Sequence, residues 1–266
     1  MVSFIQRRNR TGLIVLICLG VLGGWQLLRQ REPAYDGKPL SVWLEMIRRA
    51  THRGYITDKE AQEAIRQIGT NALPTLLRMM TAKDSAFKTR VSAALPKQWR
   101  HWFFPRSADE IQMMGAYGFV ALRTIAEPAV PALMELANAD DGEVRYHAVY
   151  ALGHLGAAAQ PAIPLLIKRL EDPVEHVRGD AMNGLAGIHL QPDLVVPVLI
   201  KYAADPNQNQ GLRYTAIQGL GYFGDHAKAA VPTLKRLLFD PDAYVRLAVT
   251  NYLPLIEPGT ALGSSN

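Results

Sequence analysis

The sequence predicts an all-α protein, a right-handed α-solenoid of stacked helical hairpins preceded by one transmembrane helix. Three observations predict it: a period of 33 to 35 residues, helical spacing of the apolar residues inside each period, and an uncharged stretch near the N-terminus. No alternating strand pattern is present. With 266 residues, of which 48% are hydrophobic, the chain is long enough for one main domain beside an anchor.

Residues 1–32 form the predicted N-terminal signal anchor. The uncharged run from Thr11 to Leu28 has 18 residues and spans about 27 Å as a helix, close to the thickness of a hydrocarbon core. It lacks the small-residue cleavage site of a signal peptide, because Trp25 directly follows the glycine pair at 23 and 24. Three arginines precede the run and two follow it, so we expect a cytoplasmic N-terminus and an extracytoplasmic (periplasmic) repeat domain. A repeat domain tethered on the cytoplasmic side, as a regulator, is the alternative.

Charge argues against a nucleic-acid partner. The five arginines of residues 1–31 leave 24 basic residues against 24 acidic ones, so the pI near 9.3 belongs to the anchor. A neutral remainder lacks the basic surplus that phosphate binding requires. Residues 33–107 carry 13 basic and 6 acidic side chains, and residues 108–266 carry 11 and 17. The basic half can rest on anionic headgroups, although a solvated surface explains it as well.

Residues 33–107 hold a predicted cap helix, a first helix pair and an insertion. Apolar spacing predicts the cap helix over about 39–50, where it shields the first pair from water. Thr57 and Glu60 form a predicted capping box at the start of the first helix of the pair. Gly69 is expected to close that helix.

The insertion lies between residues 84 and 107 and interrupts the array by some two dozen residues. It interleaves large aromatics with cations, namely Lys97, Trp99, Arg100, Trp102, Phe103, Phe104 and Arg106. This composition is enriched at interface hot spots and at bilayer surfaces. We therefore predict a partner-binding role, while a loop folded over the repeats would need the same aromatics.

Residues 108–256 carry the regular repeats, and residues 257–266 form a predicted flexible tail. Three markers share one period. The arginines recur at spacings of 33, 35 and 33 residues: Arg145, Arg178, Arg213 and Arg246. The prolines recur at 33, 33 and 35 (Pro131, Pro164, Pro197 and Pro232), and three aspartates, each followed by proline, recur at 33 and 35 (Asp172, Asp205 and Asp240). In one unit Gly156 stops the first helix, and Pro161 and Pro164 are expected in the first turn of the second. Each unit is thus a helical hairpin that must stack on its neighbours to bury its apolar side.

These units resemble HEAT repeats, especially the subgroup whose first helix carries hydrophobic-Arg, then Ala, then Leu-Gly, as in Val144-Arg145, Ala148, Ala151, Leu152 and Gly153. The resemblance covers residues 108–256 and, more loosely, 57–82. The segment from Tyr35 to Leu44 also resembles a lead-in of bacterial HEAT-repeat proteins with an N-terminal anchor. The resemblance implies a scaffold for protein partners. Relatives that attach bilins to proteins or remove damaged DNA bases supply the enzymatic alternative.

Motifs that suggest chemistry are better explained by packing. Gly219, Gly221 and Gly224 have the spacing of a dinucleotide-binding loop, but they end a helix instead of following a strand. The seven histidines show no metal-ligand spacing; His147 and His154, for example, are seven residues apart on one helix. The single cysteine, in the anchor, excludes a disulfide framework. We predict no enzyme activity, cofactor, metal or small-molecule substrate.

Two sets of recurring residues are candidates for a role. The arginines and aspartates that mark the period are expected to form a structural ladder, in which each aspartate caps the next helix and each arginine pairs with a carboxylate of a neighbouring repeat. The fourth residue after each repeat proline forms a second set, here called the basic column: Glu135, Lys168, Lys201 and Arg236. In HEAT arrays the second helices line the concave face. An acidic segment of a partner protein can therefore lie along this column, although a solvated face is also compatible with it.

Overall fold

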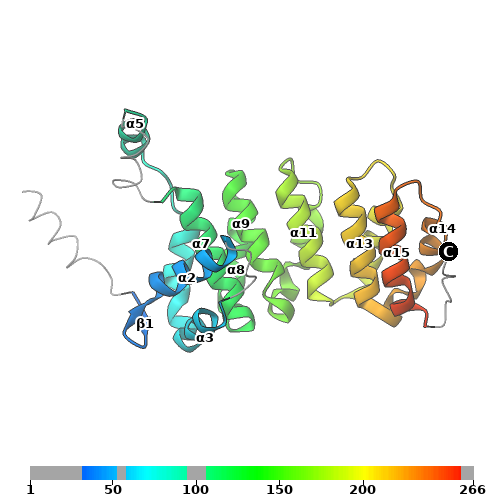
Figure 1. Cartoon of the computed structure of the whole chain (residues 1–266), viewed down its shortest axis with the longest axis horizontal. Helices are drawn as coiled ribbons and strands as arrows, with labels where there is room; N and C mark the ends of the chain where they lie inside the picture. Colours follow the sequence, from blue (N-terminus) through cyan, green and yellow to red (C-terminus); the bar gives the residue numbers. More distant parts are fainter. Residues whose placement is uncertain (1–31, 53–57, 95–105, 259–266) are drawn as a thin grey trace, which may run out of the picture.

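The computed structural model describes residues 32–52, 58–94 and 106–258. Within them the chain is an array of paired helices along the longest axis of the molecule (Figure 1). The first helices of the regular repeats are α7 (Ala108–Leu122), α9 (Gly142–Gly153), α11 (Glu175–Ile188), α13 (Gln210–Phe223) and α15 (Ala243–Ile256). The second helices are α8 (Val130–Leu136), α10 (Ile163–Arg169), α12 (Pro192–Ala204) and α14 (Val231–Leu237). This is the all-α repeat architecture that the period predicts.

The described part begins with a β-hairpin that the sequence analysis did not predict. Strand β1 (Ala34–Tyr35) pairs antiparallel with β2 (Lys38–Pro39). Asp36 and Gly37 both have positive φ, as a two-residue hairpin turn requires. Strands of two residues are too short to show alternation, so only the Asp-Gly pair signals this hairpin.

The predicted cap helix is α2 (Leu40–His52), and it buries Leu40, Trp43 and Leu44 against the first pair. That pair is α3 (Lys59–Ile68) and α4 (Leu73–Met80), joined by the 3-10 segment η1 (Gly69–Ala72). The predicted Thr57–Glu60 capping box is wrong. Asp58 is the N-cap of α3, and its carboxylate accepts a hydrogen bond of 3.1 Å from the Ala61 amide. A carboxylate is also favoured there by the helix dipole.

The predicted insertion contains the helix α5 (Ala86–Ala94), which projects away from the array (Figure 1). After the insertion, Ser107 and Glu110 form a capping box at the start of α7. Arg106 joins Arg48 and Arg49 around Glu45 on α2, with a distance of 3.2 Å between Arg106 Nη2 and Glu45 Oε2. The hydrogen bond from Arg48, aided by Arg49 and Arg106, outweighs burial and lowers the pKa of Glu45 to about 2.

None of the helices that the structure describes is long and apolar enough to cross a membrane. The predicted anchor over residues 11–28 lies outside the described residues, and so does the predicted tail of residues 257–266 except for Glu257 and Pro258.

Within a regular hairpin, a 3-10 segment separates the two α-helices. The segments are η2 (Arg123–Ala129), η3 (Gly156–Ala162) and η4 (Gly224–Ala230). Pro164 lies in the first turn of α10 as predicted, but Pro161 lies inside η3, so its predicted place in that turn is wrong. Because Pro164 has no amide proton, it cannot donate to the carbonyl four residues earlier, and a regular α-helix cannot include both prolines. The hairpin of α11 and α12 has no 3-10 segment between its helices.

A residue with positive φ turns the chain after each first helix that is followed by a second. Gly69, Gly156 and Gly224 have φ of +63°, +62° and +52°. At the same point of their hairpins, Arg123 and His189 both have a φ of +53°. Residues with a Cβ atom are disfavoured at positive φ, so these two hairpins are strained at the position where the others have glycine.

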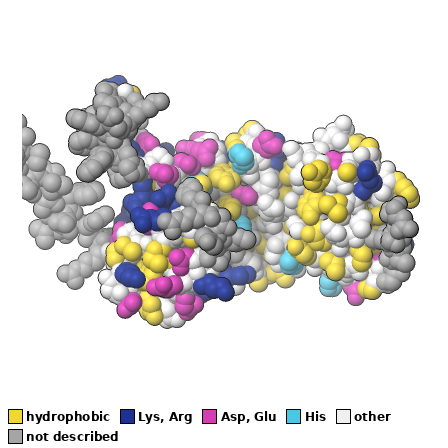
Figure 2. Space-filling model, in the orientation of Figure 1, with side chains coloured by type: hydrophobic (Ala, Val, Ile, Leu, Met, Phe, Trp, Pro, Cys, Tyr) yellow, Lys and Arg dark blue, Asp and Glu magenta, His cyan; other side chains and the backbone are white. Residues whose placement is uncertain are grey.

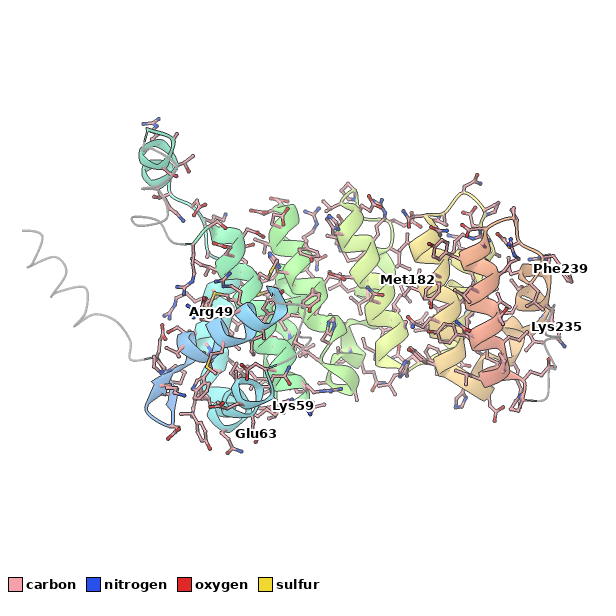
Figure 3. The ribbon with its side chains drawn as sticks, viewed as in Figure 1. Arg49, Lys59, Glu63, Met182, Lys235 and Phe239 are labelled. Atoms are coloured by element: carbon pink, nitrogen blue, oxygen red, sulfur yellow. The ribbon has the colours of Figure 1, made fainter. Side chains whose placement is uncertain are left out.

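Consecutive first helices approach closely through small residues. A Cβ built on Gly153 of α9 would lie 2.9 Å from the Cα of Gly184 on α11, which is closer than side chains pack. Met182 of α11 is buried on the side of this helix that faces α13 (Figure 3). One continuous hydrophobic core therefore runs through the repeats from α2 to α15.

The predicted ladder is present at two junctions. Arg145 binds Asp172, in the turn that connects α10 to α11, through two hydrogen bonds of 3.0 Å, and both side chains are buried. Arg213 and Asp240 repeat this fork. The aspartates do not cap the helices, contrary to the prediction. Asp172, for example, accepts from the Val174 amide at 3.0 Å, two residues on and before α11 begins.

The ladder is absent at the junction between them. Arg178 donates to the backbone carbonyls of Asp172 and Pro173 and makes no ion pair with Asp205 among the described residues. Asp205 accepts from the amides of its own turn, which is two residues longer than the others: Asp205 and Arg213 are eight apart, against six for Asp172 and Arg178. Arg246 likewise donates to the carbonyls of Asp240 and Pro241.

Candidate interaction surface

The basic column lies on the second helices. Lys168, Lys201 and Arg236 are exposed in the last turns of α10, α12 and α14. A cation in the last turn of a helix is stabilised by the macrodipole, which gives the column a structural reason. Lys168 and Arg236 make no ion pair with the described residues, and Lys201 Nζ lies 5.7 Å from the centroid of the Tyr202 ring. The three positive charges are therefore free to meet a partner.

Glu135 breaks the column at its N-terminal end. It is exposed in the last turn of α8, where a negative charge opposes the helix dipole. Beside it, η2, α8 and η3 enclose a hollow of about 620 Å³, whose apolar lining includes Pro131, Met134 and Ala158. Glu127 and Glu135 add two carboxylates to this lining. The face thus combines an apolar hollow that has acidic side chains with a series of cations on the three following helices.

The predicted partner-binding residues of the insertion, four aromatics and one arginine, fall outside the described residues. They are Trp99, Arg100, Trp102, Phe103 and Phe104. Of the cations that flank them, Arg106 is described, and it binds Glu45 on α2.

A polar hollow on the first helices was not predicted. It measures about 410 Å³, lies between α9, α11 and α13, and is lined by Tyr146, His176, Asp180 and Thr215 among others. Burial raises the pKa of Asp180, and its buried Oδ2 has no hydrogen-bond partner among the described residues. Figure 2 shows that charged side chains on this side of the molecule gather over its N-terminal half.

Three side chains that can hold a metal ion also meet on the first helices. They are Asp109 of α7 and Glu143 and His147 of α9. The sequence analysis missed them because Asp109 lies 38 residues before His147, in another repeat. The only local signal is the spacing of four between Glu143 and His147, which puts both on one side of a helix.

The stacked hairpins, the shared core and the repeated arginine–aspartate forks define an α-helical repeat protein. Residues 119–186 and 196–262, just over half of the chain, match the family described as HEAT repeats. The chain therefore belongs to the HEAT-repeat family, as the sequence resemblance implied.

Solved structures resemble the chain at low identity. The crystal structure of an engineered protein is 18% identical, with a TM-score of 0.41, over 82% of this chain and 68% of that one. Human deoxyhypusine hydroxylase in complex with glycerol is 15% identical, with a TM-score of 0.41, over 82% of this chain and 98% of that one. No curated protein matches the sequence.

Proposed function

We propose that the protein is a membrane-anchored scaffold that binds protein partners through the face of its second helices and catalyses no reaction. HEAT repeats generally bind proteins. The observation that carries the proposal is the apolar hollow at α8 together with Lys168, Lys201 and Arg236, which are exposed on the following second helices and make no ion pair with the described residues. The partner segment that fits is acidic, with an apolar side chain near one end for the hollow beside Glu135.

A pull-down from crosslinked membranes tests this surface. We expect the double variant Lys168→Glu, Lys201→Glu to lose a partner that the wild type captures, because two attractive charges become repulsive. Met134→Ala should weaken the same capture by removing an apolar wall of the hollow. Lys59→Glu reverses one charge at an exposed lysine of α3 and serves as the control for a single Lys→Glu change away from the column. A partner retained by the double variant would contradict the basic column as the binding surface.

The aromatic insertion is a second proposed contact. Its large aromatic side chains next to cations support binding to a protein or to the bilayer surface. We expect Trp102→Ala to reduce capture of the partner or to release the domain from vesicles of anionic lipid. Unchanged capture and unchanged vesicle binding would remove the insertion from the interaction surface.

The proposed compartment is the periplasmic side of the membrane. The arginine bias around residues 11–28 supports it. A C-terminal alkaline phosphatase fusion should be active, since that enzyme works only outside the cytoplasm. A C-terminal fusion to a fluorescent protein that folds only in the cytoplasm should show no fluorescence. The opposite pattern would favour the cytoplasmic regulator. Purified protein that carries a bilin or removes damaged DNA bases would contradict the absence of catalysis.

A further inference from the structure

Three metal-ligating side chains converge between the first helices of two repeats. His147 Nε2 lies 2.9 Å from Asp109 Oδ1, and a Glu143 carboxylate oxygen completes a group whose members all lie within 4.8 Å of one another. Glu143 and His147 are one helical turn apart on α9, and Asp109 belongs to the first turn of α7. The group therefore joins two successive hairpins.

Burial fixes the imidazole and leaves the carboxylates accessible. His147 is 1% exposed, whereas the Asp109 side chain is 52% exposed and Glu143 is also exposed. A buried imidazole nitrogen that faces two exposed carboxylates supplies one fixed ligand and two that have room to adjust. An ion placed there is reachable from solvent and keeps an open coordination position.

The surroundings of this group are negative. Neither Asp109 nor Glu143 forms an ion pair with a lysine or arginine among the described residues. Asp109 and Glu143 thus bring two carboxylates to His147 with no lysine or arginine of the described residues paired to them, and such an arrangement favours a bound cation.

We propose that Asp109, Glu143 and His147 bind one divalent transition-metal ion of the Zn²⁺ type. One imidazole and two carboxylates suit such an ion, while Mg²⁺ and Ca²⁺ prefer oxygen ligands alone. Tetrahedral ligands at about 2.1 Å from Zn²⁺ are about 3.4 Å apart. The His147–Asp109 pair, at 2.9 Å, is closer than this, and no two ligand atoms of the group are more than 4.8 Å apart, so small movements of the two exposed carboxylates can form the site.

Calorimetric titration of the chelator-treated full chain with Zn²⁺ tests the proposal. We expect one saturable site per chain, and Asp109→Asn or Glu143→Gln should each weaken Zn²⁺ binding at least tenfold. The same variants should alter the visible absorption of bound Co²⁺, which reports its coordination. Asp193→Asn and His226→Gln serve as controls, because they change an exposed acid in the first turn of α12 and an exposed histidine on η4.

The outcome does not depend on the partner of the scaffold. His147→Gln should abolish saturable binding, and circular dichroism at 222 nm will show whether the variant folds. If it does not fold, the two carboxylate variants decide alone, since both change exposed side chains. Absence of saturable Zn²⁺ binding, or binding that both carboxylate variants leave unchanged, would overturn the proposal. Equal competition by Mg²⁺ or Ca²⁺ would overturn it as well, because the imidazole would then contribute nothing.

Discussion

Replacing Asp172 with alanine removes the centre of a buried charge network. Its carboxylate receives two hydrogen bonds of 3.0 Å from Arg145, one of 3.0 Å from Arg169 and one of 3.0 Å from the Val174 amide. Asp172 is 3% exposed and Arg145 is 8% exposed. The variant therefore leaves a desolvated guanidinium without its counter-charge at a junction between hairpins.

We expect Asp172→Ala to lower the free energy of unfolding by about 3–5 kcal/mol, the usual effect of removing one partner of a buried ion pair. Asp205→Ala is the matched control. Asp205 occupies the same point of the period, but within the described part of the chain its hydrogen bonds come from its own turn, so its loss should cost about 1 kcal/mol or less. The difference between the two variants measures the fork at the junction.

Urea unfolding of the full chain, followed by circular dichroism at 222 nm, gives both values. Equal losses in the two variants would refute the role assigned to the fork. The measurement also has a predicted pH dependence. Burial opposes ionisation of Asp172, but the hydrogen bonds from Arg145, the Val174 amide and Arg169 hold its pKa below its usual value. Its stabilisation is therefore present above the unfolded pKa of about 3.9 and is lost as pH falls through the lower folded pKa.

Four further substitutions test other parts of the fold. Arg123→Gly should raise the free energy of unfolding by about 1 kcal/mol, because it relieves a positive φ; a decrease in urea unfolding would contradict the assignment of strain. Gly153→Ala should lower it by about 1–2 kcal/mol, since its Cβ would lie 2.9 Å from backbone of the next first helix, whereas Gly179→Ala, with nothing within 4 Å, should raise it by about 0.5–1 kcal/mol. Glu45→Gln should be destabilising near neutral pH by at most about 3 kcal/mol. Since Arg48 above all lowers the pKa of Glu45 from 4.5 to about 2, that difference should vanish as pH falls through this window. A loss that does not change with pH would point to packing instead.

Much of the fold follows from local patterns. The helix pairs, the turn at Gly156 and the stacking order were predictable, because a hairpin with one apolar side must be covered by its neighbours. The ends of elements were less predictable. The cap of α3 is Asp58, one residue from the predicted cap, and either side chain is chemically suited to that position.

The basic column was predictable from the sequence because its members recur at the repeat period, and the structure leaves all four exposed. The apolar hollow beside Glu135 was not predictable, since it forms where α8 meets η3 of the next hairpin. The convergence of Asp109 with Glu143 and His147 has the same origin. Both features depend on how far apart two hairpins lie, which no local pattern specifies.

The sequence by itself determined that this chain is a stack of helical hairpins. Each period of 33 to 35 residues forms a hairpin with one apolar side, and that side is removed from water by packing on the neighbouring hairpins. Only the tertiary structure decided which of the recurring charges meet. Arg145 forms an ion pair with Asp172, while Arg178 donates hydrogen bonds to backbone carbonyls and does not pair with Asp205 among the described residues. The physical reason is that the donor–acceptor distance of a hydrogen bond can vary by only a few tenths of an ångström. A turn longer by two residues displaces Asp205 relative to Arg178 by far more than that.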